Sequence, residues 1–203
     1  MLHKETVERS TFELLMKIMG DSRLSDFALA GGTNLSLSLG HRKSIDLDLF
    51  SLKPFNGEEL ADYLTKKYNI VLQMVNIKGT VKGIIGEVLV DFIVHSYPLL
   101  QNIDTEENIR LYSLKDIAAM KLNAIADNGT RLKDFVDIAY LSSKIPLSEM
   151  LNAYSQKYGS EPMRALRGLT YFEDIDFNVE INLTIADFDW KKIKEQILQM
   201  VRL

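Results

Sequence analysis

The stretch that decides the fold runs from Gly31 to Phe50 and reads GGTNLSLSLGHRKSIDLDLF. The pattern after the two glycines predicts a short helix, a basic loop and then a strand. Asp46 and Asp48 stand on that strand with one apolar residue between them, so both side chains point to the same face, roughly 6.5–7 Å apart at their Cα atoms. Two like charges this close repel each other unless a cation lies between them. Carboxylates in this arrangement suit Mg²⁺, which takes one or two of them together with phosphate oxygens.

The two aspartates also have a simpler explanation, an edge strand whose acidic face lies in water. A second strand candidate favours the metal site. Residues Glu87 to Val94 are almost wholly apolar, and after Glu87 itself the exception is Asp91 near the centre, which is the pattern of a strand buried on both faces. A charged carboxylate in such a strand is costly unless it is paired or binds metal. Asp91 would then complete a two-metal site with Asp46 and Asp48; the alternative is an ion pair with an arginine or lysine of the C-terminal half.

The glycines and the basic loop favour an anion site. Gly31 and Gly32 let the backbone turn and approach a ligand closely, and Thr33 opens the following helix, whose free N–H groups suit phosphate. The sequence contains neither a Walker A loop nor a GxGxxG loop. The basic loop could contact phosphate or the carboxylates, or lie in solvent as an ordinary charged surface. It consists of His41, Arg42, Lys43 and Ser44.

Composition excludes several classes of protein. The chain has 203 residues, of which 46% are hydrophobic and 26% charged, with a net charge of −4. These values are typical of a globular protein and argue against one that coats nucleic acid with a basic surface. The absence of cysteine excludes disulfides, thiolate zinc sites and cysteine nucleophiles. Because no apolar segment reaches the roughly 20 residues of a membrane span or resembles a signal peptide, we expect a cytoplasmic protein without membrane association.

Periodicity predicts two halves of different character. Strands are expected over 27–30, 45–50, 70–77, 80–86 and 87–95, with a hairpin connection at 76–79. Helices are expected over 4–20, 34–39, 58–68, 130–141 and 187–201, and between a capping box at Ser113 and a stop at Asn128-Gly129. The fold class is therefore α+β (or α/β) over residues 1–110, followed by a helical half, residues 111–203, that packs across a cleft.

The helical half carries three charged residues of interest. Lys121 lies on a largely apolar helix, where it either snorkels to solvent or meets a phosphate. Asp134 and Asp137 share a helix face and need a cation that Arg131 and Lys133 are not placed to supply. We expect Asp137 to orient Lys121 or an arginine rather than to bind metal; a salt bridge that only packs the domains is the alternative.

A later arginine pair is ambiguous. Arg164 and Arg167 lie on one face of a possible helix. They would either contact an RNA backbone or lie in solvent.

The order of glycines, short helix, basic loop and DxD resembles the DNA polymerase β-like nucleotidyltransferase superfamily. LAGGTNLSLSLGHRKSIDLDLF is similar to the first motif of the AbiEii/AbiGii toxin family, the nucleotidyltransferase component of type IV toxin–antitoxin pairs. SLKDIAAMKLNAIADNGTRLKDFVDIAYL resembles its second signature, a helix with a lysine, a short loop and a KDxxDxxxL helix. The similarity extends over residues 28–141, and the last 60 or so residues carry no recognised motif.

The resemblance implies a mixed sheet flanked by helices, with residues 1–110 as catalytic core and 111–203 completing the active-site cleft. It implies transfer of a nucleotide from an NTP, with one or two Mg²⁺ ions and release of pyrophosphate. By position, Asp46, Asp48 and Asp91 would hold the metals, and Asp91 would also help to deprotonate the acceptor hydroxyl. The phosphates would be bound by Gly31, Gly32, Thr33 and Lys121, with Arg42, Lys43 and Ser44 nearby, and Asp134 and Asp137 belong to the KDxxD match.

One position departs from the family pattern. Many relatives have an arginine in the inter-helix loop where this chain has Asn128. Arg131 or Lys133 would take over that contact to phosphate or base.

Three functional hypotheses follow. The first is an Mg²⁺-dependent nucleotidyltransferase that modifies RNA, plausibly tRNA, as a toxin, with a cognate antitoxin implied by the family alone. The second is the same chemistry on a small hydroxylated molecule such as an antibiotic, which the acidic net charge favours. The third is a binding protein that has kept the fold and lost turnover, against which the presence of Asp46, Asp48, Asp91 and Lys121 argues.

Overall fold

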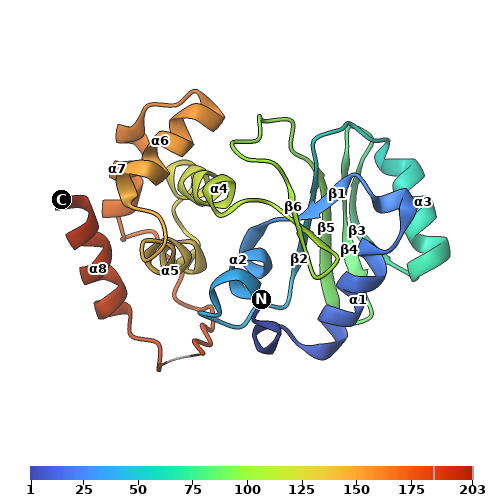
Figure 1. The fold of residues 1–203 in the computed structure, drawn as a ribbon, viewed down its shortest axis with the longest axis horizontal. Coiled ribbons are helices and arrows are strands. Elements are labelled where there is room, and N and C mark those ends of the chain that lie inside the picture. The colour runs from blue at the N-terminus through green and yellow to red at the C-terminus, as the bar shows by residue number, and fades with distance from the viewer. Residues whose placement is uncertain (185, 203) are drawn as a thin grey trace.

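The computed structural model describes residues 1–184 and 186–202 and contains one seven-stranded sheet with helices beside it (Figure 1). The strands are β1 (Phe27–Leu29), β2 (Leu47–Ser51), β3 (Val71–Asn76), β4 (Thr80–Ile85), β5 (Val88–Val94), β6 (Asp104–Glu106) and β7 (Ile109–Leu111). Their order is β3-β4-β5-β2-β1-β7-β6. The pairs β2–β5 and β1–β7 are parallel and the other four are antiparallel, so the predicted mixed sheet is confirmed.

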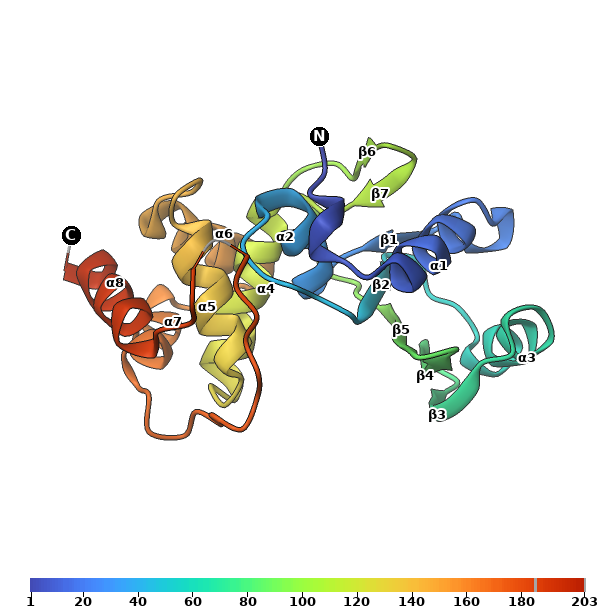
Figure 2. The ribbon, with the colours of Figure 1, turned by 90° about the horizontal axis from the view of Figure 1, so that it is seen from below.

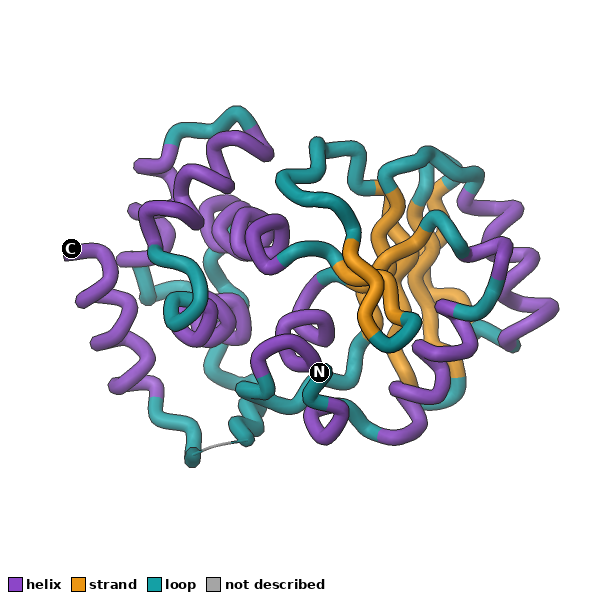
Figure 3. The backbone as a smooth tube through the Cα atoms, in the orientation of Figure 1, coloured by secondary structure: helices purple, strands orange, loops and turns teal. Residues whose placement is uncertain are grey.

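The helices form two groups, which Figure 3 shows in purple on either side of the strands. The first group includes α1 (Arg9–Met19) and α3 (Gly57–Tyr68), and α2 (Gly31–Leu39) lies near the centre of the molecule. The second group consists of α4 (Leu114–Asp127), α5 (Leu132–Leu141), α6 (Leu147–Tyr158), α7 (Pro162–Thr170) and α8 (Trp190–Arg202). The predicted cap of α4 is present, because the Ser113 hydroxyl accepts the N–H of Asp116. None of the described helices is long and apolar enough to cross a membrane.

Two clusters of buried side chains stabilise these groups. One joins α1 and α3 to a face of the sheet, where Leu47 and Leu49 of β2 and Phe92 of β5 are completely buried. The other lies among α4–α8 and reaches the sheet at Ala28 and Tyr112. Figure 2 shows the same separation, with the α4–α8 group at one end and α3 at the other. The division into domains at residue 110 remains a prediction; β7 extends the sheet to Leu111.

Several predicted boundaries shift for physical reasons. The helix expected over residues 4–20 is a 3-10 turn (Lys4–Thr6) followed by α1, because Val7 leaves the helical path to form a β-bridge with Ser44. Helix α2 begins at the glycines themselves. The hairpin of β6 and β7 was not predicted, because its strands have three residues each and are too short to show the alternation of apolar and polar residues that indicates a strand. Its turn holds Glu107 and Asn108 at positive φ.

Strand β5 corrects a prediction on which the site depends. Val88, Val90 and Phe92 are buried as expected, but Leu89 is 42% exposed and Asp91 is only partly buried. Helix α3 packs on β3 and β4 from one side, whereas Val71 and Met74 on the opposite side of β3 are 66% and 54% exposed. The expectation that this strand is buried on both faces is therefore wrong, and Asp91 lies at the edge of an open surface.

Candidate active site

The turn into α2 brings the backbone against Asp48. Gly31 has φ +64°, and a Cβ built on it would lie 1.9 Å from Oδ2 of Asp48. The N–H of Ala30 donates a hydrogen bond of 2.8 Å to the Asp48 carbonyl. Only glycine combines this backbone conformation with such a close approach, so the turn and the carboxylate form one unit.

The three predicted carboxylates lie at this turn. Asp48 and Asp91 are directly paired in the register of β2 and β5, so their side chains share one face. Asp46 precedes β2 rather than belonging to it; its carbonyl accepts a hydrogen bond from Thr33. Oδ1 of Asp46 is buried and has no hydrogen-bond partner among the described residues. Burial raises the pKa of Asp48, and the charge of Lys121 opposes that effect while Asp91 adds to it.

A metal ion fits this site in part. Among the described residues, no group of three or more His, Cys, Asp or Glu side chains is placed to hold a metal ion. Asp91 instead forms an ion pair with Lys82, a lysine of the adjacent strand rather than of the helical half. The Oδ1 of Asp46, which has no partner among the described residues, and the partly buried carboxylate of Asp48 are hard oxygen donors of the type that Mg²⁺ prefers. The residues present therefore fit one ion at Asp46 and Asp48, while Asp91 already has a cation.

Lys121 and the KDxxD residues form a buried ionic network. Nζ of Lys121 lies 2.6 Å from Oδ1 of Asp134 and 2.8 Å from Oδ2 of Asp137. Asp137 also accepts hydrogen bonds from His41 at 2.8 Å and from Nε and Nη2 of Arg42 at 2.7 and 2.9 Å. Burial alone would raise the pKa of Asp137, but Lys121, Arg42 and His41 hold it well below its usual range. Asp137 thus orients both a lysine and an arginine, as the sequence predicts.

The basic loop serves as a support. Arg42 is 3% exposed, and a Cβ on Gly32 would lie 2.4 Å from its Nη2, so the guanidinium packs behind the glycine turn. Lys43 turns away to donate to the carbonyl of Glu5. The structure does not bring these two cations to Asp48, where they were expected to meet phosphate.

Ser44 lies closer to the glycine turn, because its hydroxyl is 2.8 Å from the hydroxyl of Thr33, within hydrogen-bond distance. That contact fixes the start of α2 against the loop that leads to Asp46. Ser44 is half-buried. It contributes to the site indirectly, by contacting the Thr33 hydroxyl.

A cavity of about 220 Å³ joins the two halves of the chain. Gly31 and Asp48 line it from the core, and Lys121, Arg131 and Asp134 line it from the helical half. The cavity therefore brings together a predicted metal ligand, a predicted phosphate-binding lysine and the arginine that was expected to replace a family arginine.

One wall of the same cavity is aromatic and was missed at the level of sequence. Phe50, His95 and Tyr158 line it, with ring centroids 5.3 Å apart for Phe50 and His95 and 6.1 Å apart for His95 and Tyr158. Burial, together with the charge of Lys157, lowers the pKa of His95 to about 4. The imidazole is therefore neutral near pH 7, and this aromatic wall is uncharged. Isolated aromatic residues at these positions gave no periodic signal.

A larger opening of about 630 Å³ lies beside the end of α4. Asn128, Arg164 and Arg167 line it, and Nη2 of Arg164 is 3.4 Å from Asp127. Asn128 thus faces a different cavity from Arg131. Lys133 lines neither of the two cavities.

Comparison with known proteins identifies one family. A family model described as nucleotidyl transferase AbiEii toxin, type IV TA system, matches residues 14–88 and 83–203. A protein of Aquifex aeolicus, described as uncharacterized, is 31% identical over 197 residues, which cover 91% of this chain and 95% of that protein.

Solved structures share the fold. JHP933 from Helicobacter pylori has a TM-score of 0.56 at 19% identity, covering 97% of this chain and 92% of that one. The nucleotidyltransferase toxin MenT4 of Mycobacterium tuberculosis has a TM-score of 0.56 at 13% identity, with 87% and 76% covered. The antibiotic-resistance factor ANT(2″)-Ia has a TM-score of 0.54 at 13% identity, with 72% and 90% covered. Since the family model extends over residues 14–203, the chain belongs to the AbiEii family of nucleotidyl transferase toxins and is a nucleotidyltransferase.

Proposed function

We propose that the protein is an Mg²⁺-dependent toxin that transfers a nucleotide from an NTP to a hydroxyl of RNA, plausibly tRNA, and that a cognate antitoxin restrains it. The observation that carries the proposal is the cavity in which Asp48, backed by the glycine turn, faces Lys121 and Arg131. It supports the proposal because nucleotidyl transfer depends on positioning and on neutralising the charge of the triphosphate.

The metal belongs at Asp46 and Asp48 in this proposal. A bound Mg²⁺ would supply charge neutralisation at the α-phosphate and the leaving pyrophosphate. The Oδ1 of Asp46, which lacks a partner among the described residues, and the partly buried Asp48 would hold the ion. The cost of keeping Asp48 ionised without metal is consistent with its raised pKa.

The remaining groups bind the nucleotide. The backbone N–H groups of Gly32 and Thr33 at the start of α2 donate hydrogen bonds to a phosphate. Lys121, whose ammonium is fixed between Asp134 and Asp137, directs its third N–H towards the triphosphate, and Arg131 contacts it from the cavity mouth. The neutral aromatic wall around His95 packs on the nucleoside.

Asp91 acts on the acceptor in this proposal. The acceptor oxygen bonds to the α-phosphorus, the bond to the β-phosphate oxygen breaks, and pyrophosphate leaves. Asp91, adjacent to Asp48 in the sheet, receives the proton of the acceptor hydroxyl. The same chemistry on a small hydroxylated acceptor is the alternative.

The test uses purified protein, Mg²⁺, each α-labelled NTP in turn and total cellular RNA, resolved on a denaturing gel. We expect a labelled band in the tRNA range with the wild type and none with Asp48→Asn. Asp104→Asn is the matched control, because Asp104 is exposed on β6 and the substitution is chemically identical. Transfer retained by Asp48→Asn would overturn the metal assignment, and labelling of small hydroxylated molecules alone would replace RNA as the acceptor.

A further inference from the structure

The open face of the sheet continues directly from the catalytic carboxylates. One row of residues crosses four strands in register: Asp48 of β2 pairs with Asp91 of β5, Asp91 with Lys82 of β4, and Lys82 with Met74 of β3. Residues paired across strands project from the same face. Met74 and Lys82 therefore lie on the surface that begins at Asp91 and extends away from the cavity.

Apolar side chains line the same surface beside this row. Leu89 pairs with Ile84, and Ile84 pairs with Val71, so the three form a neighbouring row. This row lies two residues along β4 and β5, and three residues along β3, where the register shifts between Leu72 and Met74. Val71 is 66% exposed, Met74 54% and Leu89 42%. Helix α3 lies on the other side of these strands (Figure 2). Exposed apolar patches next to a polar site mark binding surfaces.

We propose that this surface, the acceptor face (Val71, Met74, Lys82, Ile84 and Leu89), binds the acceptor, and that the acceptor is a phosphodiester strand end. Lys82 binds the phosphate next to the reacting hydroxyl, and the apolar side chains of the acceptor face pack against the bases of the acceptor strand. The inference rests on the proposed function, because it places the acceptor beside Asp91. It adds the location of the acceptor and its chemical class.

The charge of the acceptor face carries this choice of class. The Lys82 ammonium has three N–H donors and gives one to Asp91; the side chain is 36% exposed, so the ammonium can also meet an anion that arrives from solvent. The carboxylates of this row, Asp48 and Asp91, lie on the side of the cavity, and the five residues of the acceptor face beyond them include one cation and no carboxylate. A polycationic amino sugar would need carboxylates at this position and would meet Lys82 as a like charge.

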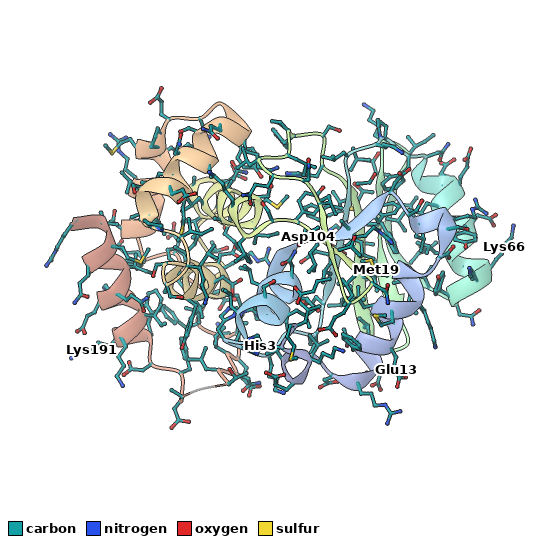
Figure 4. The ribbon with its side chains drawn as sticks, in the orientation of Figure 1. His3, Glu13, Met19, Lys66, Asp104 and Lys191 are labelled. Atoms are coloured by element: carbon teal, nitrogen blue, oxygen red, sulfur yellow. The ribbon has the colours of Figure 1, made fainter. Side chains whose placement is uncertain are left out.

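Removal of the Lys82 charge tests the phosphate contact. The probe is a fluorescein-labelled RNA hairpin with a single-stranded 3′ end, whose affinity is measured by anisotropy at several salt concentrations. For Lys82→Gln we expect binding about tenfold weaker, with the salt dependence of log K reduced by about 0.7, and a loss larger than any loss of Mg²⁺–NTP affinity in calorimetry. Lys66→Gln is the matched control, since Lys66 projects from the outer side of α3 (Figure 4) and is 73% exposed.

A second pair of variants tests the apolar part of the acceptor face. Met74→Asp places a negative charge on the acceptor face, whereas Val75→Asp places it one residue further on the opposite face, where Val75 pairs with buried Val81. We expect weaker RNA binding from Met74→Asp only, with thermal unfolding used to confirm that both variants are folded.

RNA binding unaffected by Lys82→Gln and Met74→Asp, or wild-type protein that binds kanamycin and not the RNA, would overturn the acceptor face. RNA binding that depends on Lys82 in a protein unable to bind Mg²⁺–NTP would support the acceptor face and overturn the proposed function instead.

Discussion

At the scale of single residues, Asp48 shows how function and stability diverge. Its carboxylate is partly buried, its pKa is raised, and Gly31 touches it so closely that no side chain fits between them. Each of these features costs free energy in the isolated chain. In the proposed function, a ligand that contacts both residues where they line the cavity offsets these costs.

Gly31→Ala should abolish transfer because the added methyl group would displace Asp48. The backbone also has φ +64°, which costs a non-glycine residue about 1 kcal/mol. Gly86→Ala separates the two effects: Gly86 has the same φ, and a Cβ there meets nothing within 4 Å. We expect both variants to lose similar backbone stability in urea unfolding, while only Gly31→Ala loses NTP labelling. Equal activity in the two variants would contradict the close contact with Asp48.

His95 gives a pH prediction of known sign. Its pKa of about 4 in the folded state lies below its ordinary value of 6.5, so the unfolded chain binds a proton more readily between these values. Stability attributable to neutral His95 is complete above pH 6.5 and is lost as the pH falls towards 4. We expect the difference in melting temperature between wild type and His95→Gln to shrink over that interval. A constant difference from pH 7.5 to 4.5 would show that the imidazole is not desolvated.

At the scale of elements, the pairing of α4 with α5 sets the position of Lys121. Helical periodicity and the KDxxD spacing were sufficient to predict both helices and the orienting role of Asp137. The partners from the basic loop were not predictable in this detail, because Arg42 and His41 lie 95 and 96 residues away from Asp137 in sequence. Tertiary packing alone decides that Arg42 supports the glycine turn and does not face the cavity.

Asp137→Ala should destabilise the protein by about 3–5 kcal/mol, because it leaves Arg42 and Lys121 with uncompensated buried charge. Asp127→Ala near the exposed end of α4, where the side chain is 76% exposed, should change stability by less than about 0.5 kcal/mol. Urea unfolding measures both. A small effect of Asp137→Ala would mean that Asp134 and water satisfy the two cations.

At the scale of the whole molecule, the sequence allows most of the architecture to be inferred. The alternation of apolar and acidic residues over 45–50 and the glycine breaks around β4 predicted the strands and a shared face for Asp46 and Asp48, and the similarity to a known family supplied the mixed sheet. The exposure of Leu89 and the Lys82–Asp91 pair were not predictable, because an apolar run does not reveal whether both faces of its strand are covered. The aromatic wall depends on Tyr158 of α6 meeting Phe50 of β2 across the cavity, a contact that no local pattern encodes.

Because the cavity is lined by both halves of the chain, Mg²⁺–NTP should stabilise the whole fold. At a concentration of 100 times Kd the expected gain is about 2.7 kcal/mol, which raises the melting temperature in the wild type. Asp48→Asn should show no such shift, although removal of a buried charge leaves its own melting temperature unchanged or higher. Differential scanning calorimetry with and without nucleotide measures both; an equal shift in the variant would place the nucleotide elsewhere.

Strand β3 has one further consequence. It is the last strand of its sheet, all six of its residues are exposed, and none is charged. Its outer amide and carbonyl groups are templates for an additional strand from another polypeptide. We therefore expect crowding to favour intermolecular sheet extension and precipitation, so that the surface proposed for an acceptor would also limit how concentrated the free protein can become.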